Sequence, residues 1–563
     1  MVSDERALAT WLAARDDVSL ASVLAARGIP ASTGWQDFFD AAEALLDPAS
    51  IDRALLRLPR RALAALTHAP SAAALEQLAF LTAAGKPYAA VIAQVDALRA
   101  EHPSAFEPDP HDAPRTTDDR ETAAAAERAF TTAGALADVL LAASHAPLGR
   151  TGVGPVSAVD RKRLIESRAV ETADELEDLL VAATATGLMR AGEREWTITA
   201  AGERWLELST TARWEAVATG IATLLPRTGD GSAAPPAAWA GAYPLDAEWP
   251  AQAARLERMS RAWGLLDPSG AEPAWAASLR AGGPVDGSPL AAHLPAEIDR
   301  VYLQADLSAI SPGPLLPALE MRLRRIAARE SRAQASSYRF TSESVTAALT
   351  EGETAASMVE FLGALSLTGI PQPLKYLIES TASRHGLVRV STAATGRTLV
   401  ESPDAALLDA IAVDQALRSL GLIAEDGALH TRVAREAVYW SLADARYPVV
   451  AVDDTGAPES LHRRPSAGSA APPAPADAYA PLIQRLRGGH DASGDEGWLE
   501  RELDQAVRAR AAILVVVRMP DGAERAFTLE AAGLGGGRLR GRDRAADIER
   551  TLPVSSIVSV RPA

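Results

Sequence analysis

Hydrophobic residues recur at helical spacing through the first hundred residues of the chain. Leucine, alanine and aromatic residues return every three or four positions in several short runs, one of which contains the pair Phe38-Phe39. This spacing indicates amphipathic helices in a bundle, where an aromatic pair is more often core than a binding stripe. Between 101 and 122, proline and acidic residues replace the apolar pattern, as is typical of a linker. We therefore expect a helical N-terminal domain and linker over 1–122.

A second pattern, a helix followed by Gly-Leu and another apolar residue, recurs four times further along the chain. The junctions begin at Gly187, Gly264, Gly386 and Gly421. Each is followed by apolar and polar residues in an order that predicts a hairpin, and a helix with a hairpin behind it forms the second half of a winged helix. Residues 123–295 are therefore expected to form a winged-helix-like array. A glycine that ends a helix before a strand is also common in other α+β proteins.

The most informative stretch of the chain is 338–390. Two threonines are placed to N-cap short helices, two glycines to end them, and one proline to occupy the first turn of a third helix. These residues are Thr341, Gly352, Thr354, Gly369 and Pro373. A strand from Leu387 follows Gly386 directly. Three short helices closed by extended chain are the plan of a helix-turn-helix or winged-helix module.

At these residues the chain resembles the N-terminal domain of XPB-type DNA helicases, which also occurs in bacterial helicase-associated proteins that carry it without a motor. With its flanks the resemblance covers 296–456. It rests on Tyr338, Ser344, Ala348-Leu349, Gly352, Met358-Val359, Phe361-Leu362, Ser366, Ile370-Pro371, Pro373 and His385-Gly386, and upstream on Val301 to Leu307 with Pro312-Gly313-Pro314. The resemblance implies a module that supports DNA handling beside a helicase, repair or transcription protein, and it implies no catalytic residue.

The C-terminal part of the chain predicts a small β domain. A run rich in proline, alanine and serine over 457–477 is typical of a flexible linker. Over 478–563 the pattern gives a helix, the apolar strand 513–517, a Pro-Asp-Gly turn and further strands. This order resembles the WYL domain of bacterial regulators, an Sm-like barrel, although the Trp-Tyr-Leu signature itself is absent.

Together these elements predict an α+β multidomain protein that is mostly helical, with winged-helix-like modules, an XPB N-terminal-like domain and a small C-terminal β-barrel. The chain of 563 residues is long enough for several domains. It has no run of 18 apolar residues, so we expect no membrane partner. It also has no cysteine, which fits a reducing cytoplasm, and a place beside the nucleoid is compatible with this. No sequence signal fixes the oligomeric state.

Charge limits where nucleic acid can bind. The net charge is −17, and the acidic excess lies mainly in the N-terminal half, so any contact with DNA must be local. Two arginine rows are candidates: Arg322, Arg325, Arg329 and Arg332, on a helix expected from Leu315 to about Arg332, and Arg538, Arg540, Arg542 and Arg544, on one side of an extended segment. Guanidinium groups bind phosphate well, but the first row can also be a solvated face and the second a solvated loop balanced by Asp543, Asp547 and Glu549.

Motifs for catalysis are absent from the sequence. There is no phosphate-binding GxxxxGK[ST] loop, no HExxH, no EF-hand loop and no GxSxG elbow, so we expect no enzyme activity, cofactor or metal. The acidic run Asp174, Glu175, Glu177 and Asp178 could hold a cation, but such a run is more often the solvated side of a helix. Two functions remain: a non-catalytic DNA-associated scaffold beside a helicase, repair or transcription complex, or a ligand-responsive regulator or adaptor whose winged helices bind protein.

Overall fold

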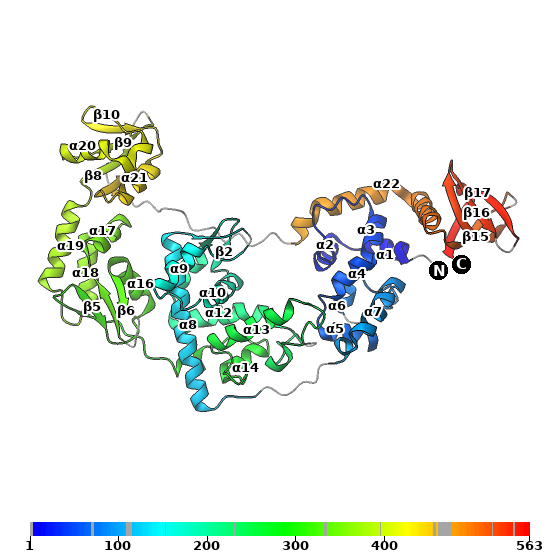
Figure 1. Ribbon diagram of the computed structural model, residues 1–563, viewed down its shortest axis with the longest axis horizontal. Coiled ribbons are helices and arrows are strands. Elements are labelled where there is room, and N and C mark those ends of the chain that lie inside the picture. The colour runs from blue at the N-terminus through cyan, green and yellow to red at the C-terminus, as the bar shows by residue number, and fades with distance from the viewer. Residues whose placement is uncertain are drawn as a thin grey trace. The chain divides into compact units, whose positions relative to one another are not determined.

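The protein is a mixed α+β chain, about half helical, with several small sheets (Figure 1). The computed structural model describes residues 4–68, 73–108, 115–152, 154–228, 231–331, 335–393, 396–453, 456, 458–459, 475–520, 522–543 and 546–563. The chain forms two compact units. The first contains residues 1–113, 226–254 and 470–563, and the second contains 114–225 and 255–469. Each unit is therefore assembled from segments that are distant in the sequence.

The first unit begins with short helices, in agreement with the apolar periodicity. They are α1 (Asp4–Ala13), α2 (Asp17–Ala26), α3 (Phe38–Leu46), α4 (Pro48–Leu55), α5 (Arg60–His68), α6 (Ala73–Gln77) and α7 (Ala89–Glu101). Aspartates N-cap three of them, because the side chains of Asp16, Asp37 and Asp47 accept hydrogen bonds from backbone N–H groups of the first turn. Phe38 and Phe39 are buried, so the aromatic pair packs rather than forming an exposed binding stripe.

A long helix, α22 (Pro475–Ala509), joins the two ends of the chain within this unit. Leu482, Ile483 and Leu486 pack into the core of the N-terminal helices. Arg501 forms ion pairs with Asp37 at 2.8 Å and with Asp40 at 2.9 Å. The predicted start of the C-terminal domain at 478 thus falls inside a helix that is packed against the N-terminal core. Most of the predicted 457–477 linker, namely 460–474, lies outside the described residues.

The second half of α22 covers one face of a five-stranded antiparallel sheet. The strands are β14 (Ala512–Arg518), β15 (Glu524–Gly535), β16 (Arg538–Asp543), β17 (Ile548–Pro553) and β18 (Ile557–Pro562), in the order β17-β16-β15-β14-β18. The expected closed barrel is wrong for the described residues, because β17 and β18 remain the two edges of an open sheet. Both edge strands carry a proline, Pro553 and Pro562, which has no N–H to donate to a further ladder.

The second unit opens with helices and a small sheet in the order α8 (Asp119–His145), β1 (Leu148–Gly149), α9 (Ala158–Glu166), α10 (Ala173–Ala185), β2 (Met189–Ala191) and β3 (Glu195–Ile198). The strands pair in the order β1-β3-β2, so the hairpin expected after Gly187 is present. Further helices follow: α11 (Ala200–Trp205), α12 (Thr210–Leu224), α13 (Trp249–Ala262), of which only the part from Arg255 belongs to this unit, α14 (Ala274–Arg280) and α15 (Ser288–Ala291).

The hairpin expected after Gly264 is wrong, since no strand is described between 264 and 275. Gly264 has a left-handed backbone (φ +63°) and lies so close to α8 that an added Cβ would be 2.3 Å from the carbonyl oxygen of Ala125. Leu265 and Leu266 are buried, and Trp275 is already in α14. The glycine therefore turns the chain into the core beside α8 instead of leading into an exposed hairpin.

The remainder of the second unit holds two sheets. The first, β4-β5-β7-β6, is built from β4 (Tyr302–Leu303), β5 (Ser308–Ser311), β6 (Ala328–Ser331) and β7 (Ser336–Arg339), with α16 (Pro317–Ile326) between β5 and β6. Next come α17 (Ser342–Thr350), α18 (Ala355–Leu365) and α19 (Gln372–Arg384). Thr341 and Thr354 each N-cap a helix in a reciprocal capping box, with Ser344 and Ser357 respectively, as the sequence predicts for the two threonines.

The second of these sheets has the order β10-β11-β9-β8-β12-β13. Its strands are β8 (Val388–Thr392), β9 (Thr398–Glu401), β10 (Ile423–Glu425), β11 (Ala428–Thr431), β12 (Val449–Val452) and β13 (Pro458–Glu459), with α20 (Ala405–Val413) and α21 (Arg435–Asp444) beside them. The hairpins expected after Gly386 and Gly421 are both present, as β8-β9 and β10-β11. Along the described parts of the chain, no helix is long and apolar enough to cross a membrane.

Two adjacent glycines in α22 give a matched test of its packing on the N-terminal helices. An added Cβ at Gly489 would be 2.0 Å from the carbonyl oxygen of Gln36, whereas at Gly488 it would meet nothing within 4 Å. We expect Gly488→Ala to raise the free energy of unfolding by up to about 1 kcal/mol, because alanine favours helix over glycine. Gly489→Ala should lower it and reduce the melting temperature. Equal stabilisation of both variants in thermal unfolding would contradict this packing.

Candidate functional site

The first arginine row does not lie on one helix. α16 ends at Ile326, and the backbone of Ala327 is already extended (φ −137°, ψ 142°). Arg329 follows in β6, where it lies opposite Tyr338 of β7. The expected helix to Arg332 is therefore wrong, because sheet pairing with β7 overrides the helical preference of the segment. Arg332 itself lies outside the described residues.

Two members of this row, Arg322 and Arg325, lie near the same carboxylate. Arg322 donates two hydrogen bonds to Glu353, at 2.9 and 3.0 Å, and its guanidinium lies 4.5 Å from the ring centre of Phe361. The bonds from Arg322 hold the pKa of Glu353 below its usual value, and the charge of Arg325 acts in the same direction. Arg322 is therefore committed within the domain, whereas Arg325 has an exposed side chain.

Arg329 belongs to a buried ionic cluster centred on Asp138 of α8. Asp138 accepts hydrogen bonds from Arg329 and, at 2.6 Å, from Arg324 of α16. Glu320 pairs with Arg329 at 3.2 Å and accepts a hydrogen bond from the Tyr338 hydroxyl at 3.3 Å. Burial, followed by the nearby charge of Glu320, raises the pKa of Tyr338. Arg329 is thus a structural residue with no open face for a phosphate group.

Sequence reasoning missed both Asp138 and Arg324 in this cluster. Asp138 is 186 residues from Arg324 in the chain, and it lies in the alanine-rich stretch that forms α8. The row was recognised because its arginines follow one another at intervals of three, four and three residues. Arg324 does not fit these intervals. No spacing rule within one helix connects such residues, so only the fold could reveal the pairing.

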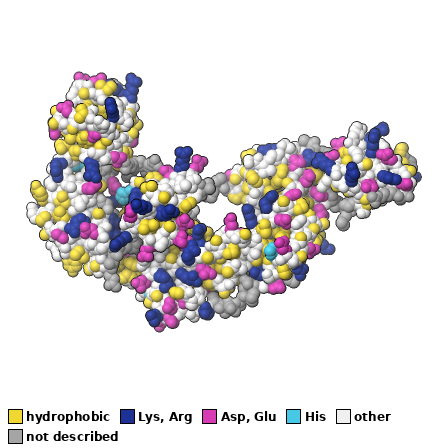
Figure 2. Space-filling view, viewed as in Figure 1, with side chains coloured by type: hydrophobic (Ala, Val, Ile, Leu, Met, Phe, Trp, Pro, Cys, Tyr) yellow, Lys and Arg dark blue, Asp and Glu magenta, His cyan; other side chains and the backbone are white. Residues whose placement is uncertain are grey.

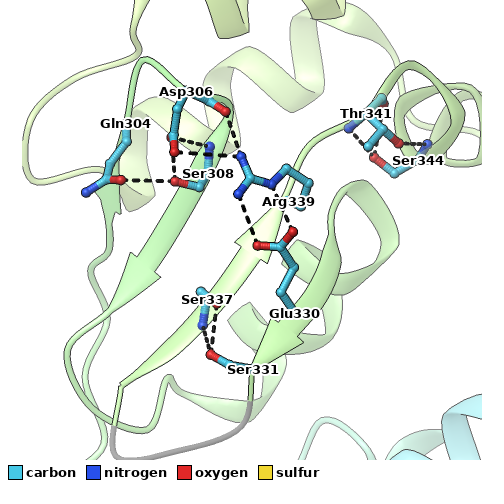
Figure 3. Close-up of polar contacts among 9 residues, drawn as sticks. All are labelled: Gln304, Asp306, Ser308, Glu330, Ser331, Ser337, Arg339, Thr341 and Ser344. Carbon is cyan, nitrogen blue, oxygen red and sulfur yellow. Dashed lines mark hydrogen bonds and ion pairs between the residues drawn. The ribbon is translucent and has the colours of Figure 1, made fainter. Parts of the chain in front are cut away.

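The turn between β4 and β5 contains a second polar network, within the segment that carries the family resemblance. Figure 3 shows Arg339 of β7 reaching between Asp306 and Glu330. Arg339 donates to the backbone oxygen of Asp306 at 2.8 Å and to both carboxylate oxygens of Glu330. The hydroxyl of Ser308 donates to Asp306 at 2.6 Å and lowers the pKa of that carboxyl. These contacts stabilise a turn in which Leu307 adopts a left-handed backbone (φ +66°).

The second arginine row occupies an open sheet face. Along β16, exposed and buried positions alternate, so that Arg538, Arg540 and Arg542 point away from the core while Leu539 and Asp543 point toward it. This is the one-sided projection that the alternate spacing predicts. Arg544 lies outside the described residues. Figure 2 shows basic and acidic side chains interspersed over the visible face of the molecule, so a basic site must be local.

The three arginines of β16 differ in their cross-strand neighbours. Arg542 lies between Glu530 of β15 and Glu549 of β17, and it forms an ion pair with Asp547 at 2.6 Å.

Arg540 lies between Gly533 and Thr551, and Arg538 between Gly535 and Pro553. Among the described residues neither of these two guanidinium groups has an ion-pair partner. Two of the three positive charges are therefore available to an external anion.

The acidic run on α10 is neither a cation site nor a fully solvated face. Asp178 forms ion pairs with Arg255 at 3.3 Å and with Arg258 at 3.1 Å, and Glu177 pairs with Arg255 at 3.6 Å. Burial raises the pKa of Asp178, although both arginines oppose that effect. In the described part of the chain, no group of three or more histidine or acidic side chains is arranged to hold a metal ion. This face of α10 instead forms ion pairs with α13.

Removing the Asp138 carboxylate should destabilise the second unit strongly. Asp138→Asn leaves two buried guanidinium groups without their shared anion, and losing one partner of a buried ion pair costs about 3 to 5 kcal/mol. Glu330→Gln is the matched control, because its arginine partner is exposed and such pairs contribute about 0 to 1 kcal/mol. Urea unfolding should show a large loss of stability for the first variant alone. Similar midpoints for both variants would contradict the buried cluster.

Residues 301–426 match the family described as helicase conserved C-terminal domain. The match begins at the strand before the Asp306 turn and ends within the β10-β11 hairpin. It therefore includes the first arginine row and the three helices α17 to α19, but not the sheet that carries Arg538 and Arg540. No curated protein matches the chain. Over this region the chain is similar to a helicase-associated domain.

Proposed function

We propose that the protein is a non-catalytic DNA-associated accessory protein that acts beside a helicase in repair or transcription. The observation that carries the proposal is the pair Arg538 and Arg540, exposed on one sheet face with uncharged cross-strand neighbours. The similarity of 301–426 to a helicase domain family supports the helicase context. The finer resemblance to the XPB N-terminal domain, and that of the C-terminal part to WYL domains, belong to the same proposal.

The chemistry of the β16 face favours contact with the phosphate backbone. Arginine remains charged at every physiological pH and donates paired hydrogen bonds to phosphate. Leu514 and Thr528, which lie opposite each other on β14 and β15, share the outer face with the arginine row. Phe527 is the one aromatic residue among the described residues of this sheet, and it lies on the other face, with Arg550 4.6 Å from its ring centre.

Proteins that grip single strands through a sheet stack the bases on exposed aromatic side chains. The β16 face offers no such platform in the described residues. We therefore infer binding that follows the backbone, depends weakly on base sequence and does not require single-stranded DNA. The acidic net charge of −17 makes this contact local, since most of the surface repels phosphate.

A second candidate function, a protein-binding adaptor, is favoured by α10. The order α8-β1-α9-α10-β2-β3 is that of a winged helix, in which α10 would occupy the place of the recognition helix. Its acidic face contacts the arginines of α13, so this module binds protein within its own chain. In the adaptor function, other helices of the chain would bind a partner protein in the same way.

Replacing Arg538 and Arg540 should weaken DNA binding and flatten its salt dependence. Each lost phosphate contact on duplex DNA reduces the slope of log K against log salt by about 0.9. We expect Arg538→Ala/Arg540→Ala to reduce the slope by nearly two such steps. Arg542→Ala is the matched control on the same strand, because its charge is already neutralised by Asp547. Fluorescence anisotropy with duplex and single-stranded DNA across a salt series, after circular dichroism confirms folding, measures both.

If the wild-type protein binds neither DNA form, the DNA-associated function is wrong. The same holds if the double variant keeps the wild-type affinity and slope. An effect of Arg542→Ala equal to that of the double variant would instead show that neighbouring acids do not decide which arginine binds.

The purified protein should hydrolyse no nucleotide, with or without DNA. The sequence has no recognised phosphate-cradling loop, and the region similar to a helicase contributes no catalytic motif of its own. Phosphate release from ATP and GTP should match that of a mock-purified control. Turnover well above that control would contradict a non-enzymatic role if the activity co-purifies with the protein through further purification steps.

A further inference from the structure

The helix α19 presents an open polar face beside the site already described. It follows α17 and α18 and precedes the β8-β9 hairpin. This is the element order of a winged helix, although β8 and β9 belong to the six-stranded sheet and its separate core. Leu374, Ile378 and Thr381 are buried on its inner side, and the two apolar ones belong to the core of this domain. Five other residues lie at i, i+3, i+4, i+7 and i+11 and are all exposed. They are Gln372, Lys375, Tyr376, Glu379 and Ser383.

Tyr376 is the most exposed aromatic side chain among the described residues. It is 69% exposed, and the other exposed tyrosine, Tyr302, is 44% exposed. No tryptophan or phenylalanine is among the exposed large hydrophobic residues of the described chain. Tyrosine is one of the residues enriched in binding hot spots, and Tyr376 lies in the middle of the stripe.

The corresponding helix of the other winged-helix-like segment shows what a covered face looks like. On α10, Asp178 is only 14% exposed and lies against the two arginines of α13. On α19, the one ion pair of the stripe joins Lys375 and Glu379 of the helix itself, at 3.9 Å, and both side chains stay about half exposed. No described segment neutralises this face, so it is free to meet a partner.

We propose that the open face of α19 reads base edges in the major groove of duplex DNA. The inference rests on the proposed DNA-associated function and deepens it. The major groove admits one α-helix, and its base edges bind side chains of the kinds found in the stripe: lysine to guanine, glutamine to adenine, and serine to either. Lys375 and Arg384 outweigh Glu379, and the helix N-terminus adds partial positive charge. The face thus matches a polyanion with hydrogen-bonding groups better than an apolar protein surface.

The first part of the test asks for sequence preference. The full-length protein is used to select duplexes from a randomised pool, and the affinity for the selected sequence is compared with that for unselected DNA. We expect Gln372→Ala/Tyr376→Ala to reduce this ratio roughly 5- to 100-fold, the value of one or more base contacts. Both positions are exposed, so folding should be unchanged. The variant keeps every charge, so the salt slope should also stay the same.

The second part places a photo-crosslinking phenylalanine analogue at position 376 or, as the matched control, at position 302. Irradiation with the selected duplex should crosslink DNA at position 376 and not at position 302. Equal crosslinking at both positions, or crosslinking at position 302 alone, would overturn the assignment of α19.

The outcomes separate this inference from the proposed function. If the protein binds DNA with a slope that depends on Arg538 and Arg540 but selects no sequence, or if the α19 variant keeps the preference, the α19 inference fails and the backbone contact stands. If the α19 variant loses a helicase partner while keeping DNA preference, the face is a protein interface and the inference is wrong. If the wild type binds no DNA, both fail.

Discussion

The pairing of Asp138 with Arg324 and Arg329 is the constraint on which the second unit depends. The carboxylate of Asp138 in α8 binds Arg324 of α16 and Arg329 of β6, which lie 186 and 191 residues further along the sequence. Desolvating an ion costs several kcal/mol, and that cost is offset only when the charges meet with good hydrogen-bond geometry. Glu320 supplies the second negative charge, so two cations face two anions in the buried cluster. The end of α16 at Ile326 and the start of β6 are what bring Arg329 to Asp138.

The same residue type has opposite surroundings in the two units. Arg329 is held by Asp138 and Glu320 and cannot leave them without exposing buried charge. Arg540 lies on an open sheet face between a glycine and a threonine. Arg561 of β18, which lies opposite Leu514, likewise has no ion-pair partner among the described residues. An arginine without a carboxylate neighbour in the fold is more informative about ligand binding than a row of arginines counted along the sequence.

Local chemistry predicted much of the fold. The capping threonines Thr341 and Thr354, and the hairpins after Gly187, Gly386 and Gly421, depend on neighbouring residues alone and occur where the sequence indicates them. The failures came where distant segments decide. Gly264 looks like the other glycines, but the backbone of Ala125 lies against it and turns the chain inward. The β-barrel was expected from strand order, which cannot show whether the edge strands β17 and β18 pair. The candidate site followed the same division: alternation along β16 and the nearby acids Asp547 and Glu549 were predictable, whereas Glu530, which β15 brings beside Arg542, was not.

Affinity and sequence choice make different physical demands, and the two candidate DNA surfaces meet one demand each. The face with Arg538 and Arg540 has charge but no exposed aromatic side chain among its described residues, so we propose that it contacts the phosphate backbone and distinguishes poorly among sequences. The α19 stripe has groups suited to base edges, but Lys375 and Arg384 together exceed Glu379 by only one charge, so alone it would bind weakly at physiological salt. Because both belong to one chain, contact by one raises the effective concentration of the other near the same duplex. We propose that an acidic protein can in this way select DNA without a broad basic surface.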